Sequence, residues 1–130
     1  LVAATTSLPY VHLAPVHVCM GECELAGGDF SAARSHFLQA LRLAPNCPAW
    51  SALDALWGMA HVLAAGDDVV AAGQIARQVA QDPATAASTR AAIGRWYPAL
   101  FGNDAAGATA VDPEEAEQGR LLLVAAMVGA

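Results

Sequence analysis

The 130-residue chain contains no lysine, and all six of its basic residues are arginines. With twelve carboxylates its formal net charge is -6, which would repel a phosphate backbone. Direct binding of nucleic acid is therefore not expected. A Walker-type phosphate loop needs a lysine followed by serine or threonine, so the glycine pairs of this chain are not predicted to bind a nucleotide.

Long apolar runs are missing as well. The longest nearly uninterrupted one, residues 121–130, is far shorter than the roughly 20 residues of a membrane-spanning helix. No basic segment precedes an apolar stretch at the amino terminus, so neither a secretory signal nor a membrane partner is expected. Three cysteines without a disulfide-framework spacing are typical of reduced thiols. These features predict a cytoplasmic protein.

Signals for β-strands are scarce, since no sustained alternation of β-branched residues occurs between turn residues. Charged residues make up only 14% of the chain and apolar residues 56%, much of it alanine. Alanine favours helices that pack closely through small side chains. An all-α fold is predicted.

A spaced set of small and apolar residues occurs twice. The clear copy is Gly21, Gly28, Asp29, Phe30, Ala33, Phe37, Ala40, Leu41 and Pro45, and the weaker copy is Gly58, Gly66, Asp67, Asp68, Ala71, Ile75, Val79 and Pro83. From Gly28 and Gly66 onward the copies align without a gap, and Gln78 then stands where an alanine is expected. A recurring helical hairpin cannot bury its apolar face alone and must stack on a neighbour, so the repeat predicts an α-solenoid.

Residues 1–130 are expected to form one helical domain. Its parts are a first hairpin at about 14–47, a second at about 49–83, a partial third at 84–104 and a closing helix at 112–129. The start of the first helix is open between the serine and proline at 7–9 and Pro15, since proline is favoured in a first turn. The closing helix begins with an Asp-Pro-Glu-Glu sequence and is expected to cover the last exposed hairpin face, because solenoid ends need capping.

The first copy resembles the tetratricopeptide repeat, in which glycine, a Gly-Asp-aromatic turn, alanine, an aromatic residue, alanine and proline follow at this spacing. The resemblance implies a right-handed stack of about two and a half helical hairpins. In such a stack Gly21 lets the two helices of the hairpin approach and Phe37 fills the gap between them.

A wider resemblance runs from about Gly21 onward, carried by the segments 52–60, 81–85, 89–90 and 112–120. These segments are similar to the C-terminal region of large bacterial signal-transduction ATPases, which combine a nucleotide-binding module with tetratricopeptide repeats, often beside a transcriptional-activator domain. The resemblance implies a non-catalytic interaction and sensor module of a cytoplasmic regulator, with any ATPase activity elsewhere in a longer chain.

By the same resemblance, the first helix of each repeat lines a concave partner-binding face. The residues expected on it are Glu22, Leu25, Ala55, Met59, Val62 and Arg95. The expected occupant is a protein or peptide partner, or other domains of a parent chain. A free-standing adaptor that holds a short peptide or helix is the alternative, and pairing of short apolar ends would also give a homodimer.

Two chemical alternatives have weaker support. Cys19 and Cys23 with nearby histidines could form a metal site, but their spacing is not that of a zinc site. The two cysteines are instead expected to be buried and to act as small hydrophobic side chains. His36 or His61 could act as the general base of a small helical hydrolase, although no nucleophile stands at a motif spacing from either. No catalytic residue, metal or cofactor is therefore predicted.

The three tryptophans have different expected roles. Trp57 and Trp96 fall on predicted inner stripes and are expected in the core. Trp50 lies at a helix start and is expected to pack the seam between hairpins, with a place on a binding surface as the alternative.

Overall fold

The computed structural model describes residues 10–43, 47–96 and 112–129, and its regular structure there is entirely helical, which confirms the predicted all-α hairpin fold. The helices are α2 (Tyr10–Ala26), α3 (Phe30–Arg42), α4 (Ala49–Ala65), α5 (Val69–Gln81), α6 (Ala87–Trp96) and α8 (Pro113–Gly129). Pro15 lies inside α2 and does not begin it. The alternative start at 7–9 and the part of the predicted third copy beyond residue 96 lie outside the described residues.

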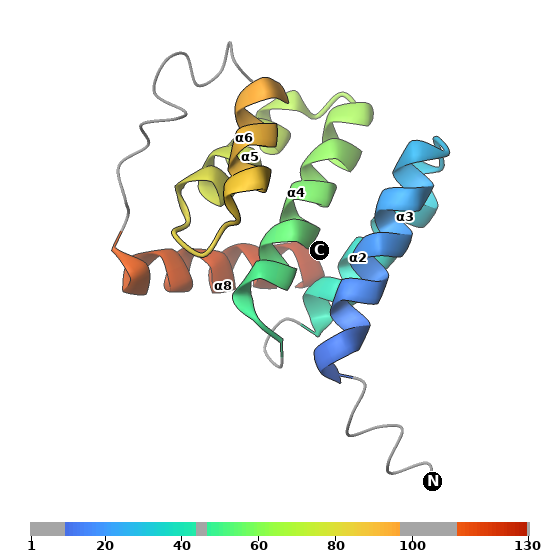
Figure 1. Ribbon diagram of the computed structural model, residues 1–130. Helices are drawn as coiled ribbons and strands as arrows, with labels where there is room; N and C mark the ends of the chain where they lie inside the picture. The colour runs from blue at the N-terminus through green and yellow to red at the C-terminus, as the bar shows by residue number, and fades with distance from the viewer. Residues whose placement is uncertain (1–9, 44–46, 97–111, 130) are drawn as a thin grey trace, which may run out of the picture.

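The hairpins α2–α3 and α4–α5 stack side by side in two layers (Figure 1). The first helices α2, α4 and α6 form the layer toward the viewer, and α3 and α5 lie behind them. Helix α4 packs against α2 and α3 on one side and against α5 on another, and it contributes more buried residues than any other described helix.

The two hairpin turns have the same backbone geometry. Gly28 and Asp67 each adopt a positive φ, 84° and 69°, in the left-handed conformation that commonly ends helices. The next residue in each case, Asp29 or Asp68, caps the following helix, because its carboxylate accepts the amide N–H three residues on, at 3.0 Å and 3.2 Å.

These turns fix the period of the repeat. The second hairpin starts its helices 39 residues after the first, as from Phe30 to Val69, and ends them at the same offset. The gap-free alignment expected from the sequence is therefore wrong by one residue. It paired Gly28 with Gly66, whereas the left-handed position of the second turn is filled by an aspartate. In the structural register Gln78 corresponds to Gln39, so it does not stand at an alanine position.

The aromatic ring of Phe37 locks the two hairpins together. Its side chain is fully buried, and it lies against the backbone of Gly21 on α2 and Gly58 on α4. A Cβ atom on Gly21 would come within 2.6 Å of the ring, and one on Gly58 would come closer still. Both glycines are needed here because side chains would collide with the ring, as the spacing predicts for Gly21.

Helix α8 begins at the predicted residue but does not take the predicted place. It crosses the back of both hairpins and contacts chiefly α3, with further contacts to α4 and α5 (Figure 1). Ala116 and Val124 are buried in this contact. An ion pair with the end of α5 also holds it there, so α8 joins the two hairpins instead of covering the face of the last one.

Candidate functional site

An accessible face is formed where α2, α4 and α6 lie side by side. We call it the front face and define it by Glu22, Trp50, Asp54, Trp57, His61, Thr89 and Trp96, all at least partly exposed. The four residues from α4 recur at helical spacing, so they form one stripe along that helix. Trp50 is 46% exposed and does not fill the seam between hairpins.

Two of the residues expected on the partner-binding face lie inside the core instead. Ala55 is 0% and Met59 2% exposed, because α4 is covered by other helices on every side except the Trp50–His61 stripe. Their assignment to an accessible face is wrong. Of the others, Glu22 and Arg95 are exposed, and Leu25 and Val62 are half-buried. The other residues of α4 are mostly small or apolar, so its stripe of polar and aromatic residues is the signal that would have identified the accessible side of this helix.

Two carboxylates lie close together on the front face. Burial raises the pKa of Asp54, and a hydrogen bond from Thr89 Oγ1 at 3.4 Å opposes that change. Burial and then the charge of Asp54 raise the pKa of Glu22. Because each charged form is disfavoured here, a cationic group that approached both carboxylates would be favoured.

An aromatic cluster lies further along the same stripe. The rings of Trp57 and Trp96 meet edge to face with centroids 4.8 Å apart, and His61 lies 4.3 Å and 3.9 Å from them. Burial lowers the pKa of His61, so its imidazole is neutral at pH 7. Both tryptophans are partly buried and pack against the core, so the cluster lies at the border between core and surface.

The other histidine and cysteine candidates take different positions. His17 and His36 stack across the first hairpin with ring centroids 5.8 Å apart, and the Nδ1 atom of each is buried without a hydrogen-bond partner. Burial and then the nearby His36 lower the pKa of His17. Cys19 and Cys23 are exposed, so the prediction that they are buried is wrong. Within the described ranges no group of three or more metal-ligating side chains is present.

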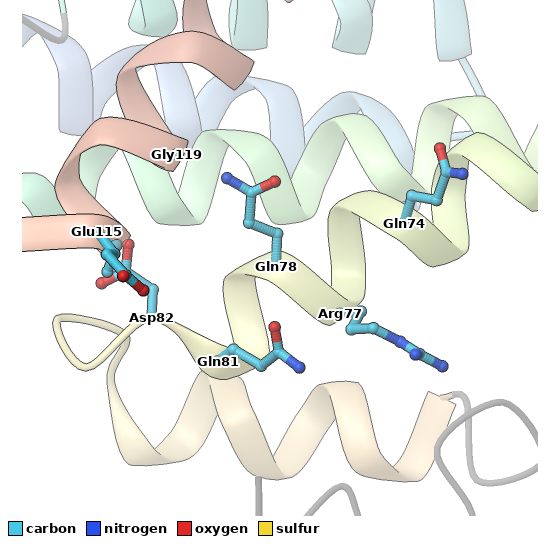
Figure 2. A pocket seen from close by; sticks show the side chains of 8 residues that line it. Gln74, Arg77, Gln78, Gln81, Asp82, Glu115 and Gly119 are labelled. Carbon is cyan, nitrogen blue, oxygen red and sulfur yellow. The ribbon is translucent and has the colours of Figure 1, made fainter. Parts of the chain in front are cut away.

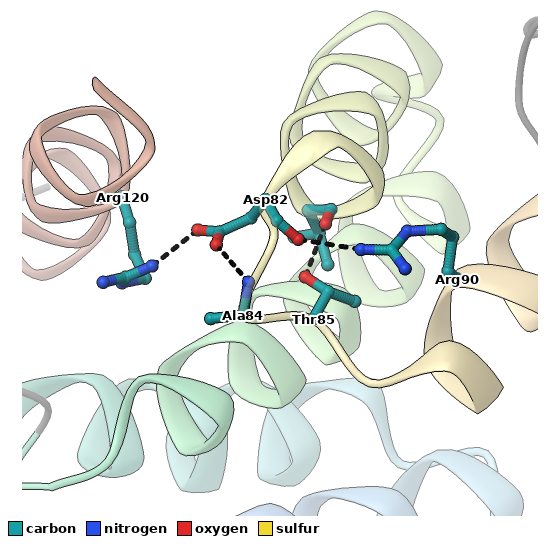
Figure 3. A network of polar contacts seen from close by, with 6 residues as sticks. Asp82, Ala84, Thr85, Arg90 and Arg120 are labelled. Atoms are coloured by element: carbon teal, nitrogen blue, oxygen red, sulfur yellow. Dashed lines mark hydrogen bonds and ion pairs between the residues drawn. The ribbon is translucent and has the colours of Figure 1, made fainter. Parts of the chain in front are cut away.

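A dense polar network joins α5, α6 and α8 (Figure 3). Asp82, just after α5, is 3% exposed, and its carboxylate accepts Arg120 Nη1 from α8 at 2.6 Å and the amide of Ala84 at 2.9 Å. Arg90 on α6 donates to the main-chain carbonyls of Ala80 and Asp82 at 2.9 Å and 3.0 Å. Arg90 thus satisfies main-chain carbonyls at the end of α5. Arg90 and Arg120 together attach α6 and α8 to this end.

No helix in the described part of the chain combines the length and the apolar character needed to cross a membrane. Comparisons of this chain with protein-family models, with curated proteins and with solved structures found no significant match.

Proposed function

We propose that this chain is a non-catalytic interaction and sensor module, a tetratricopeptide-like array within a cytoplasmic bacterial transcriptional regulator. The observation that carries this proposal is the front face, where one helix from each hairpin contributes accessible side chains. An exposed tryptophan beside paired carboxylates suits a partner segment that presents basic and apolar side chains together.

The outer side of α2 supports a place within a longer array. Leu13, Val16 and Met20 are 37%, 47% and 44% exposed and follow one another at helical spacing. The described residues thus leave an apolar stripe on the first helix, which a preceding hairpin of the same kind would cover. A second copy of the chain could cover the same stripe, which sedimentation would detect as a dimer.

Capture from cells that carry the gene tests the front face. The tagged wild-type chain is compared with a Trp50→Ala variant and with Leu122→Ala, a matched control on α8 whose side chain is 72% exposed. We expect at least tenfold less partner bound to the Trp50 variant and no change for the control, since exposed aromatic anchors contribute most to binding. Equal capture by all three proteins would show that the front face is not the site.

The regulator assignment has a separate test in the parent gene. If the flanking sequence encodes further helical hairpins and a phosphate-binding loop, the assignment is supported. If the gene encodes only this segment, the regulator assignment is wrong and a free-standing adaptor is the favoured alternative.

A further inference from the structure

A groove runs along α5 on the layer behind the front face. Two adjoining hollows of about 430 Å³ and 300 Å³ share Gln74 and Arg77 in their linings. The larger hollow is bounded by α5 and α8, and Figure 2 shows Gln78 between them. The smaller one extends toward the start of α5 at Val69 and Val70. The two hollows follow one another along α5 and share these two residues, and we call the pair the α5–α8 groove.

Three glutamines mark the length of this groove. Gln74, Gln78 and Gln81 recur at intervals of four and three residues, so they share one face of α5. Gln74 and Gln81 are exposed, and Gln78 is half-buried with its amide directed at Gly119 of α8 (Figure 2). A Cβ atom on Gly119 would lie 3.0 Å from Gln78 Nε2, so the glycine leaves room for this amide at the wall of the groove.

We propose that the α5–α8 groove binds an extended peptide segment through its main chain. Each glutamine amide offers both a donor and an acceptor, as a peptide unit requires. Residues four apart on a helix are separated by about 6 Å along its axis. Alternate residues of an extended chain repeat at about 6.6 Å, so Gln74 and Gln78 match neighbouring peptide units on one side of such a segment, whereas Gln78 and Gln81 are separated by only about 4.5 Å.

The groove also defines the length and the ends of its occupant. From Val69 to Gln81 the helix rises about 18 Å, which corresponds to an extended segment of about six residues. Val69 and Val70 are 51% and 73% exposed and suit an apolar residue at one end. At the other end the lining has two carboxylates, Asp82 and Glu115. The carboxylate of Asp82 is already bound to Arg120, so Glu115 is the one that suits a basic residue of the segment.

A titration followed by 15N NMR tests the proposal. The probes are two hexapeptides with acetylated and amidated ends, both of alternating valine and alanine, with a lysine first in one and last in the other. One of them is expected to bind with a dissociation constant of about 0.1–1 mM and to shift amide signals of α5 and α8 only. A Gln74→Ala, Gln81→Ala double variant is expected to bind at least tenfold more weakly. Gln118→Ala, an exposed glutamine of α8 outside the groove lining, is the matched control and should bind like the wild type.

N-methylated versions of the better peptide separate main-chain from side-chain recognition. Methylation of alternate residues removes the N–H groups on one side of the extended segment. Two peptides are compared, one methylated at the odd-numbered residues and one at the even-numbered residues. We expect one of them to bind at least tenfold more weakly and the other to bind like the unmethylated peptide. The proposal would be overturned by equal binding of the two methylated peptides, by shifted amide signals on the front face, or by no shifted signal at all. So would groove signals that move with protein concentration alone, because a second copy of the chain would then be the occupant.

Discussion

At the scale of single residues, one aromatic ring sets how closely the hairpins approach. Phe37 is fully buried and is flanked by glycine backbones from α2 and α4. Packing at the density of protein interiors leaves no space there for another carbon atom. The same substitution should therefore have opposite effects at different glycines of this chain.

Gly58→Ala is expected to lower the free energy of unfolding by about 1–3 kcal/mol, because the new methyl group would overlap the Phe37 ring. Gly94→Ala on α6 is the control, since a Cβ atom there meets nothing within 4 Å. It should raise the free energy of unfolding by about 0.5–1 kcal/mol through helix propensity. Urea unfolding followed by circular dichroism measures both. A Gly58 variant as stable as the wild type would contradict the packing described here.

The imidazole of His61 should make stability depend on pH. Burial lowers its pKa in the folded protein below the usual 6.5, so the unfolded chain binds the proton more readily. The contribution of His61 to the free energy of unfolding is full above about pH 6.5 and is lost as the pH falls toward the folded pKa.

NMR titration of the His61 ring should accordingly give a midpoint below 6.5 in the folded protein. His61→Phe is expected to flatten the fall in stability between about pH 7 and pH 5. An upward shift of the midpoint would show that the ring is not desolvated by the two indoles.

At the scale of elements, the end of α5 holds two other helices in place. Arg90 binds main-chain carbonyls there, and Arg120 binds the buried carboxylate of Asp82. Because the Asp82 side chain is shielded from water, removal of its cation leaves a charge that solvent cannot compensate. The position of α8 therefore depends on one ion pair as well as on apolar packing.

Arg120→Ala is expected to cost about 3 kcal/mol of stability and to speed amide hydrogen exchange throughout α8. Arg34→Ala, an exposed arginine of α3, is the control and should change stability by less than about 0.5 kcal/mol. If exchange in α8 is the same in both variants, the ion pair does not hold the helix.

The second turn offers two adjacent aspartates with different roles. Asp68→Ala removes the cap of α5 and is expected to cost about 1 kcal/mol. Asp67→Gly relieves a side chain from a left-handed backbone and should stabilise the protein or leave it unchanged. Thermal unfolding of the two variants compares them directly, and a loss in both would mean that Asp67 contributes more than backbone geometry.

At the scale of the whole molecule, the front face carries charges that oppose folding. Glu22 and Asp54 have raised pKa values, so the folded protein holds their protons more tightly than the unfolded chain does. Each carboxylate therefore destabilises the fold at neutral pH, and the effect fades as the pH falls through the raised pKa values. Such a cost is common where a surface is kept for binding.

A Glu22→Gln, Asp54→Asn double variant should raise the urea midpoint at about pH 7, and the gain should shrink as the pH approaches about 4. Glu117→Gln, an exposed residue of α8, is the control and should leave the midpoint unchanged. A gain that does not vary with pH would show that charge is not its cause.

Local signals in the sequence were enough to predict most elements but not their mutual contacts. The Asp29 cap and the Asp-Pro start of α8 are short-range features, and the helices begin where these features indicate. The register of the second hairpin was missed because aspartate took the left-handed position that glycine fills in the first. The burial of Met59 and the groove beside α8 could not be predicted, since both depend on helices distant in the sequence.

The crossing of α8 over both hairpins has a mechanical consequence. Stacked hairpins that contact one another only through neighbouring faces can change their relative angle, which opens or closes the surface on their inner side. Because α8 packs across the backs of both hairpins, it limits this motion and keeps the curvature of the front face constant. A change that displaces α8 would therefore alter the shape of the front face that a partner binds.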